Sequence, residues 1–229
     1  MTVRGLRPEL TEPRFADRRA AGRSLAIALA DRSLRDPFVL ALARGGVPVG
    51  FEVASTLHAN LDVLVARKVG APGHEEVGIG AIAEGGVVMA DPDALRALAI
   101  DDDDFAELAA TEQVELRRRL WRYRGDRALP SLAERDALLV DDGLATGVTA
   151  EASIAAVRRL APRRVLLCVP VCAPRTAARL SDVADEVVCV MCPERFVAVG
   201  ASYERFEPTT DGEVLELLDR ARAGFSRSG

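Results

Sequence analysis

The chain has 229 residues, of which 49% are apolar and only 4% aromatic, and its net charge is −5 at pH 7. This is enough apolar material for one α/β domain, with a core built mainly from Ala, Val, Leu and Ile. The acidic balance argues against a dedicated nucleic-acid binder, and no window of about 18 uncharged apolar residues indicates a membrane span. The N-terminus lacks an apolar signal core, so we expect a soluble cytoplasmic protein without membrane or nucleic-acid partners.

The first predicted element is an N-terminal helix within residues 14–35. Residues 1–13 before it are polar and interrupted by prolines, which predicts a loose arm. In the helix, Phe15, Leu25 and other apolar positions recur at helical spacing, while Arg18 falls on another face. We therefore expect an amphipathic helix that packs on the domain.

A first strand, residues 38–43, runs into Arg44-Gly45-Gly46 and then a helix that ends near His58. A strand followed by glycines and a helix N-terminus can bind an anion through backbone N–H groups. The same pattern also fits an ordinary strand-to-helix turn that carries a surface arginine.

A second strand, residues 61–66, leads into Arg67-Lys68 and the segment VGAPGHEEVG, residues 69–78. This segment has three glycines, a proline and no apolar period, so we expect a mobile loop. Residues 78–83 resemble a dinucleotide fingerprint, but Glu-Gly-Gly follows instead of a helix. A strand and hairpin turn that lead to a strand at 87–90 fit better.

Residues 91–130 predict a helical insertion between core units. Acidic residues 101–104 precede a long helical pattern, arginines gather near its end, and Gly125 suits the C-cap. The acidic run lacks the ligand spacing of a calcium loop. The arginines could contact RNA, but they more simply form a solvated face, and the role of the insertion stays open.

The most informative stretch is ALLVDDGLATGVTA, residues 137–150. A short apolar run predicts a buried strand, and Asp141 and Asp142 follow where that strand must end. A loop of small and hydroxyl residues then leads into a helix over 150–160. Together these features make a cradle for a sugar phosphate, because the helix N-terminus suits phosphate and the carboxylates suit sugar hydroxyls or a magnesium shell.

The remaining elements alternate between strands and helices, which predicts a parallel sheet with helices on both faces. They are a strand at 165–171, a helix at 174–180, a strand at 187–191 and a final helix at 213–223. Ligands bind such sheets at the carboxyl ends of the strands, where both cradles lie.

The four cysteines could be taken for a zinc site because they fall in two closely spaced pairs, Cys168 with Cys172 and Cys189 with Cys192. Positions three apart on a strand face opposite sides, however, so Cys189 and Cys192 should not converge on one metal. We interpret the cysteines as free thiols in a reducing compartment.

The segment VDDGLATGVT, residues 140–149, resembles the phosphoribosyl-pyrophosphate (PRPP) signature of the type I phosphoribosyltransferases. The resemblance implies one domain over residues 1–229: a Rossmann-like parallel sheet with helices on both faces, a helical insertion and a small hood at 193–210. Gly143 departs from the family, which usually has an aliphatic residue there, and predicts a more flexible loop.

By this resemblance, Asp141 and Asp142 would contact the ribose hydroxyls and hold Mg²⁺ indirectly, through those hydroxyls or water. Lys68 would join them as a catalytic residue. The residues expected to bind the 5′-phosphate are Ala145, Thr146, Gly147, Val148 and Thr149. The residues expected to bind pyrophosphate are Arg44, Gly45, Gly46, Arg67 and Lys68.

The base-binding residues implied by the family are Phe196 and Tyr203, on the hood at 193–210. Phe196 could equally be a small hydrophobic anchor. Ala145 replaces the Asp that hypoxanthine-guanine enzymes carry, so the acceptor base stays open. His74 could protonate a leaving group, but a single loop histidine is more often solvated.

The resemblance implies a pentosyltransferase of nucleotide salvage and nucleoside metabolism that acts as a homodimer. It would transfer the phosphoribosyl group of PRPP to a nitrogen acceptor, with Mg²⁺ as cofactor. Two alternatives remain: a PRPP-sensing regulator without catalysis, and an enzyme that acts on an amine other than a nucleobase.

Overall fold

The fold is built on a five-stranded parallel sheet with the strand order β2-β1-β6-β7-β8. The structure is a computed structural model that describes residues 14–225, so the arm expected at 1–13 lies outside the described residues. The strands of this sheet are β1 (Phe38–Leu42), β2 (Asn60–Leu64), β6 (Asp136–Val140), β7 (Arg164–Val171) and β8 (Glu186–Met191).

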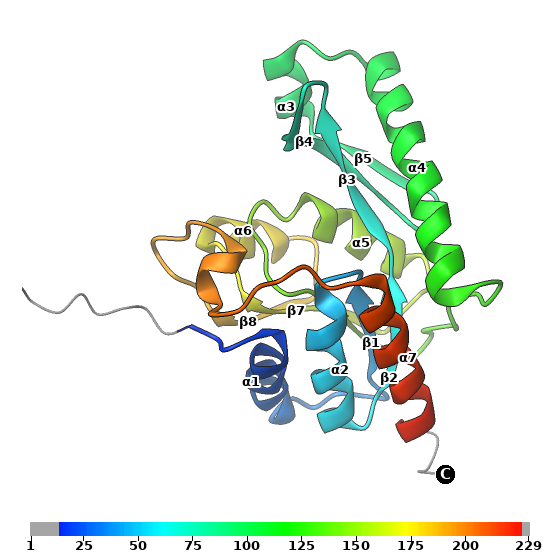
Figure 1. Ribbon diagram of the computed structural model, residues 1–229, viewed down its shortest axis with the longest axis vertical. Helices are drawn as coiled ribbons and strands as arrows, with labels where there is room; N and C mark the ends of the chain where they lie inside the picture. The colour runs from blue at the N-terminus through cyan, green and yellow to red at the C-terminus, as the bar shows by residue number, and fades with distance from the viewer. Residues whose placement is uncertain (1–13, 226–229) are drawn as a thin grey trace, which may run out of the picture.

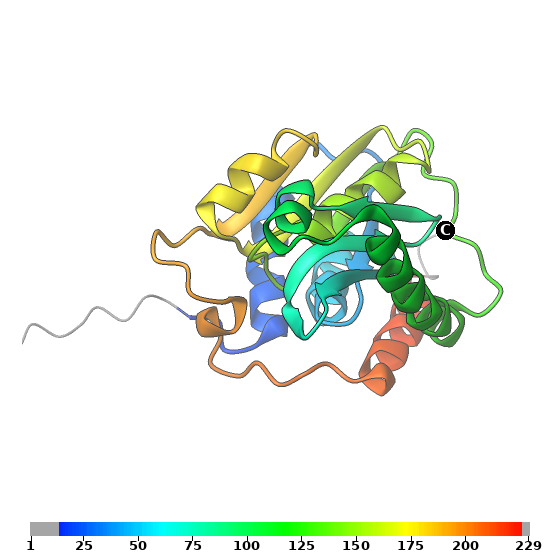
Figure 2. The same cartoon turned by 90° about the horizontal axis from the view of Figure 1, so that it is seen from above.

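Helices cover both faces of this sheet, as the alternating pattern predicts (Figure 1). One face is covered by α1 (Arg18–Ala30), α2 (Gly46–Leu57) and α7 (Asp211–Phe225). The other is covered by α5 (Val148–Arg158) and α6 (Pro174–Leu180), and Figure 2 shows the two layers on opposite sides of the sheet.

The two-residue period of a strand explains how one sheet supports two cores. On β1, Val39 and Ala41 belong to the core under α1, α2 and α7, whereas Phe38, Leu40 and Leu42 belong to the core under α5. Every residue of β1 is buried, which matches the uninterrupted apolar run in the sequence.

A second, three-stranded antiparallel sheet stands above the core and carries the inserted helices (Figure 1). Its strands are β3 (Ala66–Ala71), β4 (His74–Ala83) and β5 (Val87–Ala90), and α3 (Pro92–Leu98) and α4 (Asp102–Arg124) follow. The predicted hairpin into 87–90 is confirmed, and Gly125 is the C-cap of α4 as predicted.

The prediction that residues 69–78 form a loop is wrong, because this segment forms the β3–β4 hairpin. The pairing is irregular, with register shifts on either side of Gly70. A Cβ atom on Gly70 would lie 2.7 Å from the carbonyl oxygen of Glu75, so glycine lets the two backbones approach closely. Backbone hydrogen bonds form this hairpin without an alternating apolar pattern.

Among the described residues, no helix is both long enough and apolar enough to cross a membrane.

Candidate functional site

The two predicted cradles meet at the point where the strand order reverses. β1 is followed in the chain by β2 on one side, whereas β6 pairs with β1 on the other side and leads to β7 and β8. The loop after β1 and the acidic pair after β6 therefore leave the carboxyl ends of neighbouring strands. This switch point is where open α/β sheets bind ligands.

The glycine loop packs directly on the acidic pair. A Cβ atom on Gly45 would lie 2.1 Å from Oδ2 of Asp142, and one on Gly46 would lie 2.9 Å from Cα of Asp141. Only glycine allows this approach, because real Cβ contacts are longer. Two segments almost a hundred residues apart thus form one surface of backbone N–H groups and carboxylates.

The acidic pair is partly buried and is held by a cation from α1. Nε of Arg18 donates to Oδ2 of Asp142 at 2.7 Å, and the backbone N–H of Asp142 donates to Oδ1 of Asp141 at 2.8 Å. Burial raises the pKa of Asp142, which the Arg18 charge partly offsets. Burial and the neighbouring Asp142 charge raise the pKa of Asp141. A ligand that brings positive charge or hydroxyl donors would favour the ionised pair.

Tyr203 supports the same pair from the hood. Its hydroxyl donates to the carbonyl oxygen of Asp142 at 2.5 Å, and its ring packs between Phe15 and Phe206 with centroid separations of 5.6 and 4.8 Å. Burial raises the pKa of this phenol. Tyr203 is only 1% exposed, so this conformation offers no free ring face for a base to stack on.

The other predicted base-side residue, Phe196, packs at the border of the same aromatic cluster and is partly buried. Gly143 lies beside this region, where neighbouring side chains leave no room for a Cβ atom. A Cβ atom there would meet side-chain carbons of Val199 at 2.6 Å and Val171 at 2.7 Å. The glycine lets the hood pack tightly on the loop.

The predicted 5′-phosphate loop runs into the N-terminus of α5, where the first N–H groups of a helix lack intrahelical partners. Gly147 has φ +75° and forms the N-cap, a left-handed conformation that favours glycine. Helix α6 fixes the loop from behind: the Thr176 hydroxyl donates to the Ala145 carbonyl, and Nη2 of Arg179 donates to the Thr146 carbonyl at 2.6 Å. Arg179 brings positive charge next to the loop.

The three basic residues predicted to bind pyrophosphate, Arg44, Arg67 and Lys68, are paired with groups other than Asp141 and Asp142. Nη1 of Arg44 lies 3.7 Å from Oδ1 of Asp211, at the start of α7. Arg67 forms an ion pair with Glu112 on α4. Nζ of Lys68 donates to the Glu76 carbonyl at 2.8 Å, within its own hairpin.

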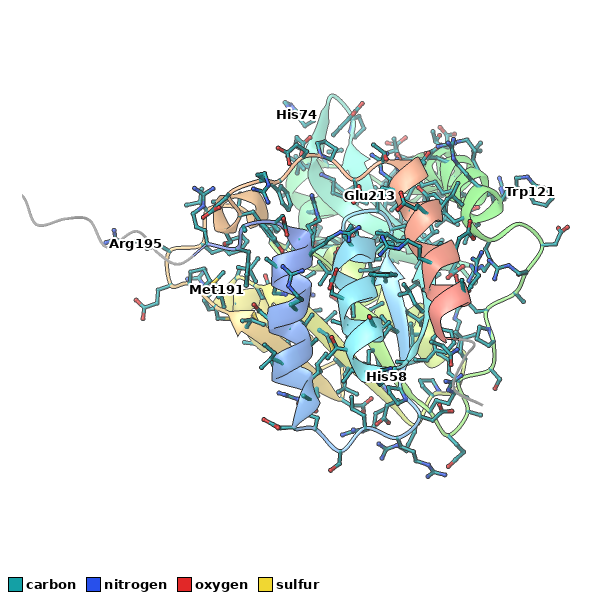
Figure 3. The ribbon with its side chains drawn as sticks, turned by 60° about the horizontal axis from the view of Figure 1, so that its bottom comes forward. His58, His74, Trp121, Met191, Arg195 and Glu213 are labelled. Atoms are coloured by element: carbon teal, nitrogen blue, oxygen red, sulfur yellow. The ribbon has the colours of Figure 1, made fainter. Side chains whose placement is uncertain are left out.

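Arg67 and Lys68 instead line a cavity of about 590 Å³ between the β3–β4 hairpin and α4. Thr149, at the end of the predicted 5′-phosphate loop, lies on its wall, so this cavity adjoins the phosphate cradle. His74 lies at the hairpin tip (Figure 3) and does not line the cavity.

The acidic pair suits an indirect rather than a direct metal role. Carboxylate oxygens are the ligands that Mg²⁺ prefers, but Arg18 already occupies one oxygen of Asp142. Within residues 14–225, no group of three or more His, Cys, Asp or Glu could hold a metal ion. The residues present fit an ion whose other ligands come from a bound phosphate, ribose hydroxyls and water.

Sequence reasoning missed three residues of this site: Arg18, Arg179 and Glu112. Arg18 looked like one arginine among several on the outer face of an amphipathic helix. Its contact with Asp142 spans 124 positions, and no local pattern indicates such a pairing.

The chain is similar to a known family of proteins. The family model described as "Phosphoribosyl transferase domain" matches residues 17–204. Two Mycobacterium tuberculosis proteins, from strains CDC 1551 and H37Rv, are each named "Putative phosphoribosyl transferase" and are 44% identical to the chain over 215 residues. The match covers 94% of this chain but 48% of each relative, so the chain spans about half their length.

Among solved structures, the crystal structure of TT1426 from Thermus thermophilus superposes with a TM-score of 0.75 and 46% sequence identity. The superposition covers 90% of this chain and 97% of that one. The likeness therefore extends over nearly the whole length of both chains.

Proposed function

Because the chain belongs to the phosphoribosyltransferase family, we propose that its site transfers the 5-phosphoribosyl group from PRPP to a nitrogen acceptor and releases pyrophosphate. The acceptor we propose first is a nucleobase. Since the Mycobacterium tuberculosis relatives are about twice as long, the proposal concerns the chemistry of this domain.

The observation that carries the proposal is the contact between the Gly45-Gly46 loop and the Asp141-Asp142 pair at the switch point. Pyrophosphate needs backbone donors, and ribose needs hydroxyl acceptors, on adjacent surfaces. The N-terminus of α5 supplies a third surface for the 5′-phosphate.

In the proposed reaction, the bond between the anomeric carbon of ribose and the pyrophosphate oxygen breaks, and a bond from the acceptor nitrogen to that carbon forms. The acceptor gives up its proton, and the electron pair of the broken bond leaves with pyrophosphate. No protein nucleophile is needed, so the chain contributes position, charge stabilisation and exclusion of water.

Each part of the site has one task in this scheme. Gly45 and Gly46 donate backbone N–H groups to pyrophosphate, and Asp141 and Asp142 accept from the ribose hydroxyls. The hairpin closes over the donor when Lys68 exchanges its contacts with Glu76 for a pyrophosphate oxygen. Mg²⁺, when bound, would neutralise charge on the leaving group.

Calorimetry with PRPP, with and without Mg²⁺, tests the binding step. We expect binding that depends on Mg²⁺ and that Asp142→Asn weakens, while Asp126→Asn, at an exposed turn after α4, leaves it unchanged. Absence of PRPP binding by the wild-type protein in the presence of Mg²⁺ would overturn the proposal.

Pyrophosphate release from PRPP, measured against a panel of purines, pyrimidines and amines, tests the catalytic step. We expect release with at least one nucleobase. Release only with amines would move the acceptor to the non-nucleobase class. Binding of PRPP without release across the panel would favour the sensing function, which is compatible with Arg67 and Lys68 both being engaged by glutamates.

A further inference from the structure

Two cysteines outside the proposed site form a close pair. Sγ of Cys192 lies 3.7 Å from Sγ of Cys189, although strand geometry predicts that residues three apart face opposite sides. That expectation is wrong because β8 ends at Met191, and the chain no longer follows the strand at Cys192. Cys192 comes to lie beside the sulfur of Cys189.

The four cysteines differ in how deeply their thiols are buried. Cys168 lies in β7 and Cys172 directly after that strand, and both are buried, where a free thiol behaves as a small apolar side chain. Cys189 is only partly buried and Cys192 is exposed, so burial explains the pair less well. A metal is not supported either, since the described residues hold no cluster of three metal ligands.

The cysteine pair lies where a dissolved oxidant can reach it. β8 is the edge strand of the sheet, and Cys192 opens the segment that leads to the hood. Figure 3 labels Met191 at the end of β8 and Arg195 farther out on the loop that follows, and Cys192, the residue after Met191, is exposed.

We propose that Cys189 and Cys192 form an oxidation site that a peroxide converts reversibly into a disulfide. The exposed Cys192 thiol first gives its proton to solvent. The thiolate then attacks one peroxide oxygen, the O–O bond breaks, and the leaving hydroxide takes up a proton, so that the products are a sulfenic acid and water. The Cys189 sulfur then attacks the Cys192 sulfur, and the S–O bond breaks. The leaving hydroxide takes the Cys189 proton and departs as water.

In total, two thiols and one hydrogen peroxide give one disulfide and two waters, with sulfur oxidised and peroxide oxygen reduced. The surroundings of the two thiols decide which one reacts with peroxide first. Burial raises the pKa of the Cys189 thiol, and its S–H donates to the Met191 carbonyl at 3.0 Å. Cys189 is therefore the resolving thiol, and Cys192, open to solvent, meets the oxidant first.

The bridge would tie the start of the 193–210 segment to β8. Because Tyr203 of that segment donates to the Asp142 carbonyl, oxidation would act on the segment that supports the acidic pair. The oxidation itself does not depend on the proposed function, and its test needs no activity measurement.

The test treats the reduced protein with hydrogen peroxide and measures intact mass, followed by peptide mapping without reductant. We expect a loss of about 2 Da, assigned to a Cys189–Cys192 bridge and reversed by dithiothreitol. Cys192→Ala and Cys189→Ala should each abolish the loss, whereas Cys168→Ala should retain it. Thermal melting of each variant checks that it folds.

Four results with the wild-type protein would overturn the proposal. They are an unchanged mass at peroxide concentrations that oxidise an exposed free thiol, stepwise oxygen addition to Cys192 without a bridge, a bridge from Cys192 to Cys172, and a disulfide between two chains. Retention of the mass loss in folded Cys192→Ala would do so as well.

Discussion

Arg18 connects three parts of the site through one guanidinium group. It donates to the Asp142 carboxylate, donates from Nη1 to the Glu207 carbonyl at 2.7 Å, and stacks on the Phe206 ring at 3.8 Å. Its side chain is 12% exposed, so these contacts form in a partly desolvated environment where a charged hydrogen bond is stronger.

Replacing Arg18 by Ala should weaken PRPP binding about tenfold, the effect of losing one hydrogen bond to a charged group. The pKa of Asp142 should also rise further, because the Arg18 charge lowers it in the wild-type protein. The weakening should therefore grow as the pH falls. Calorimetry at several pH values measures both effects.

Arg23→Ala is the matched control, since Arg23 lies on the same helix, is 58% exposed and pairs only loosely with Glu52 at 3.8 Å. It should leave PRPP binding unchanged. Equal affinities for Arg18→Ala and the wild-type protein would refute a binding role for Arg18.

Gly45→Ala should abolish PRPP binding and destabilise the fold by about 1–3 kcal/mol, the usual cost of overpacking. The added methyl group would lie 2.1 Å from the Asp142 carboxylate, so either the loop or the carboxylate must move. Gly212→Ala, whose added carbon would have its nearest neighbour at 3.9 Å, is the control. Wild-type binding by Gly45→Ala would contradict the close-packed arrangement.

At this scale the sequence predicted the residues that belong to contiguous motifs. The Asp141-Asp142 pair directly follows β6, and the Gly45-Gly46 loop comes within a few residues of the end of β1, so their place at the sheet edge could be expected. The sequence pointed to Tyr203 as a base-binding residue but not to its hydrogen bond with the Asp142 carbonyl, because the two residues are 61 positions apart.

One buried ion pair joins α4 to the three-stranded sheet. Arg124, at the end of the helix, pairs with Glu84 in the turn between β4 and β5, and both side chains are at most 7% exposed. Oε1 of Glu84 and Nη1 of Arg124 have no partner. Burial raises the pKa of Glu84 to about 7, although Arg124 opposes the rise.

This pair should make stability fall as the pH rises from 4.5 toward 7. Glu84 ionises near 4.5 when the chain is unfolded and near 7 when it is folded, so the unfolded state loses its proton first. The stabilisation is present below 4.5, and about 3 kcal/mol is lost by the time the pH has passed 7. Urea unfolding of the wild-type protein and Glu84→Gln across this range should show the slope only in the wild-type protein.

Glu216→Gln removes one partner of an exposed ion pair with Arg220 and should retain the wild-type slope. An identical pH dependence in Glu84→Gln and the wild-type protein would rule out the assigned titration.

At the element scale, the central strands and helices were predictable because their apolar patterns are clear. The β3–β4 hairpin was not. Its glycines and charged residues carry no alternation, and its order comes from pairing with a strand that lies next in the chain, with a bulge at Gly70. Backbone pairing of this kind leaves little trace in side-chain patterns.

Asp136, at the amino end of β6, is the centre of an ionic cluster with arginines that precede or begin neighbouring strands. Its fully buried carboxylate accepts from the Arg35 backbone N–H at 2.9 Å and from the side chains of Arg163 at 2.5 Å and Arg164 at 2.9 Å. Burial favours the protonated form, but the bonds from Arg164, Arg163 and Arg35 prevail and lower the pKa to about 2. The cluster joins the segment before β1 to β6 and β7.

Asp136→Asn should destabilise the whole molecule by about 2 kcal/mol at neutral pH. Because the folded pKa lies below the unfolded value of 3.8, the stabilisation is present above 3.8 and disappears as the pH falls toward 2. Urea unfolding should therefore show a gap between wild-type and variant at pH 7 that narrows in acid. A gap that is constant with pH would contradict this origin, and Asp126→Asn should show none.

For the whole molecule, the sequence predicted the fold class because the PRPP-like motif and the strand-helix alternation pointed to the same architecture. The sequence could not predict the contact between the hood and the residues just before α1. Phe15 and Tyr203 form an isolated parallel β-bridge, and no sequence motif links these two segments.

That bridge has a consequence for how the protein is made. The Phe15 N–H donates to the Ser202 carbonyl at 2.9 Å, and the Glu204 N–H donates back to the Phe15 carbonyl at 2.8 Å. The ribosome synthesises Phe15 long before its two partners, Ser202 and Glu204. A nascent chain stalled before Ser202 could assemble the parallel sheet, yet its acidic pair would lack Tyr203. The completed site thus forms only after synthesis has passed Glu204.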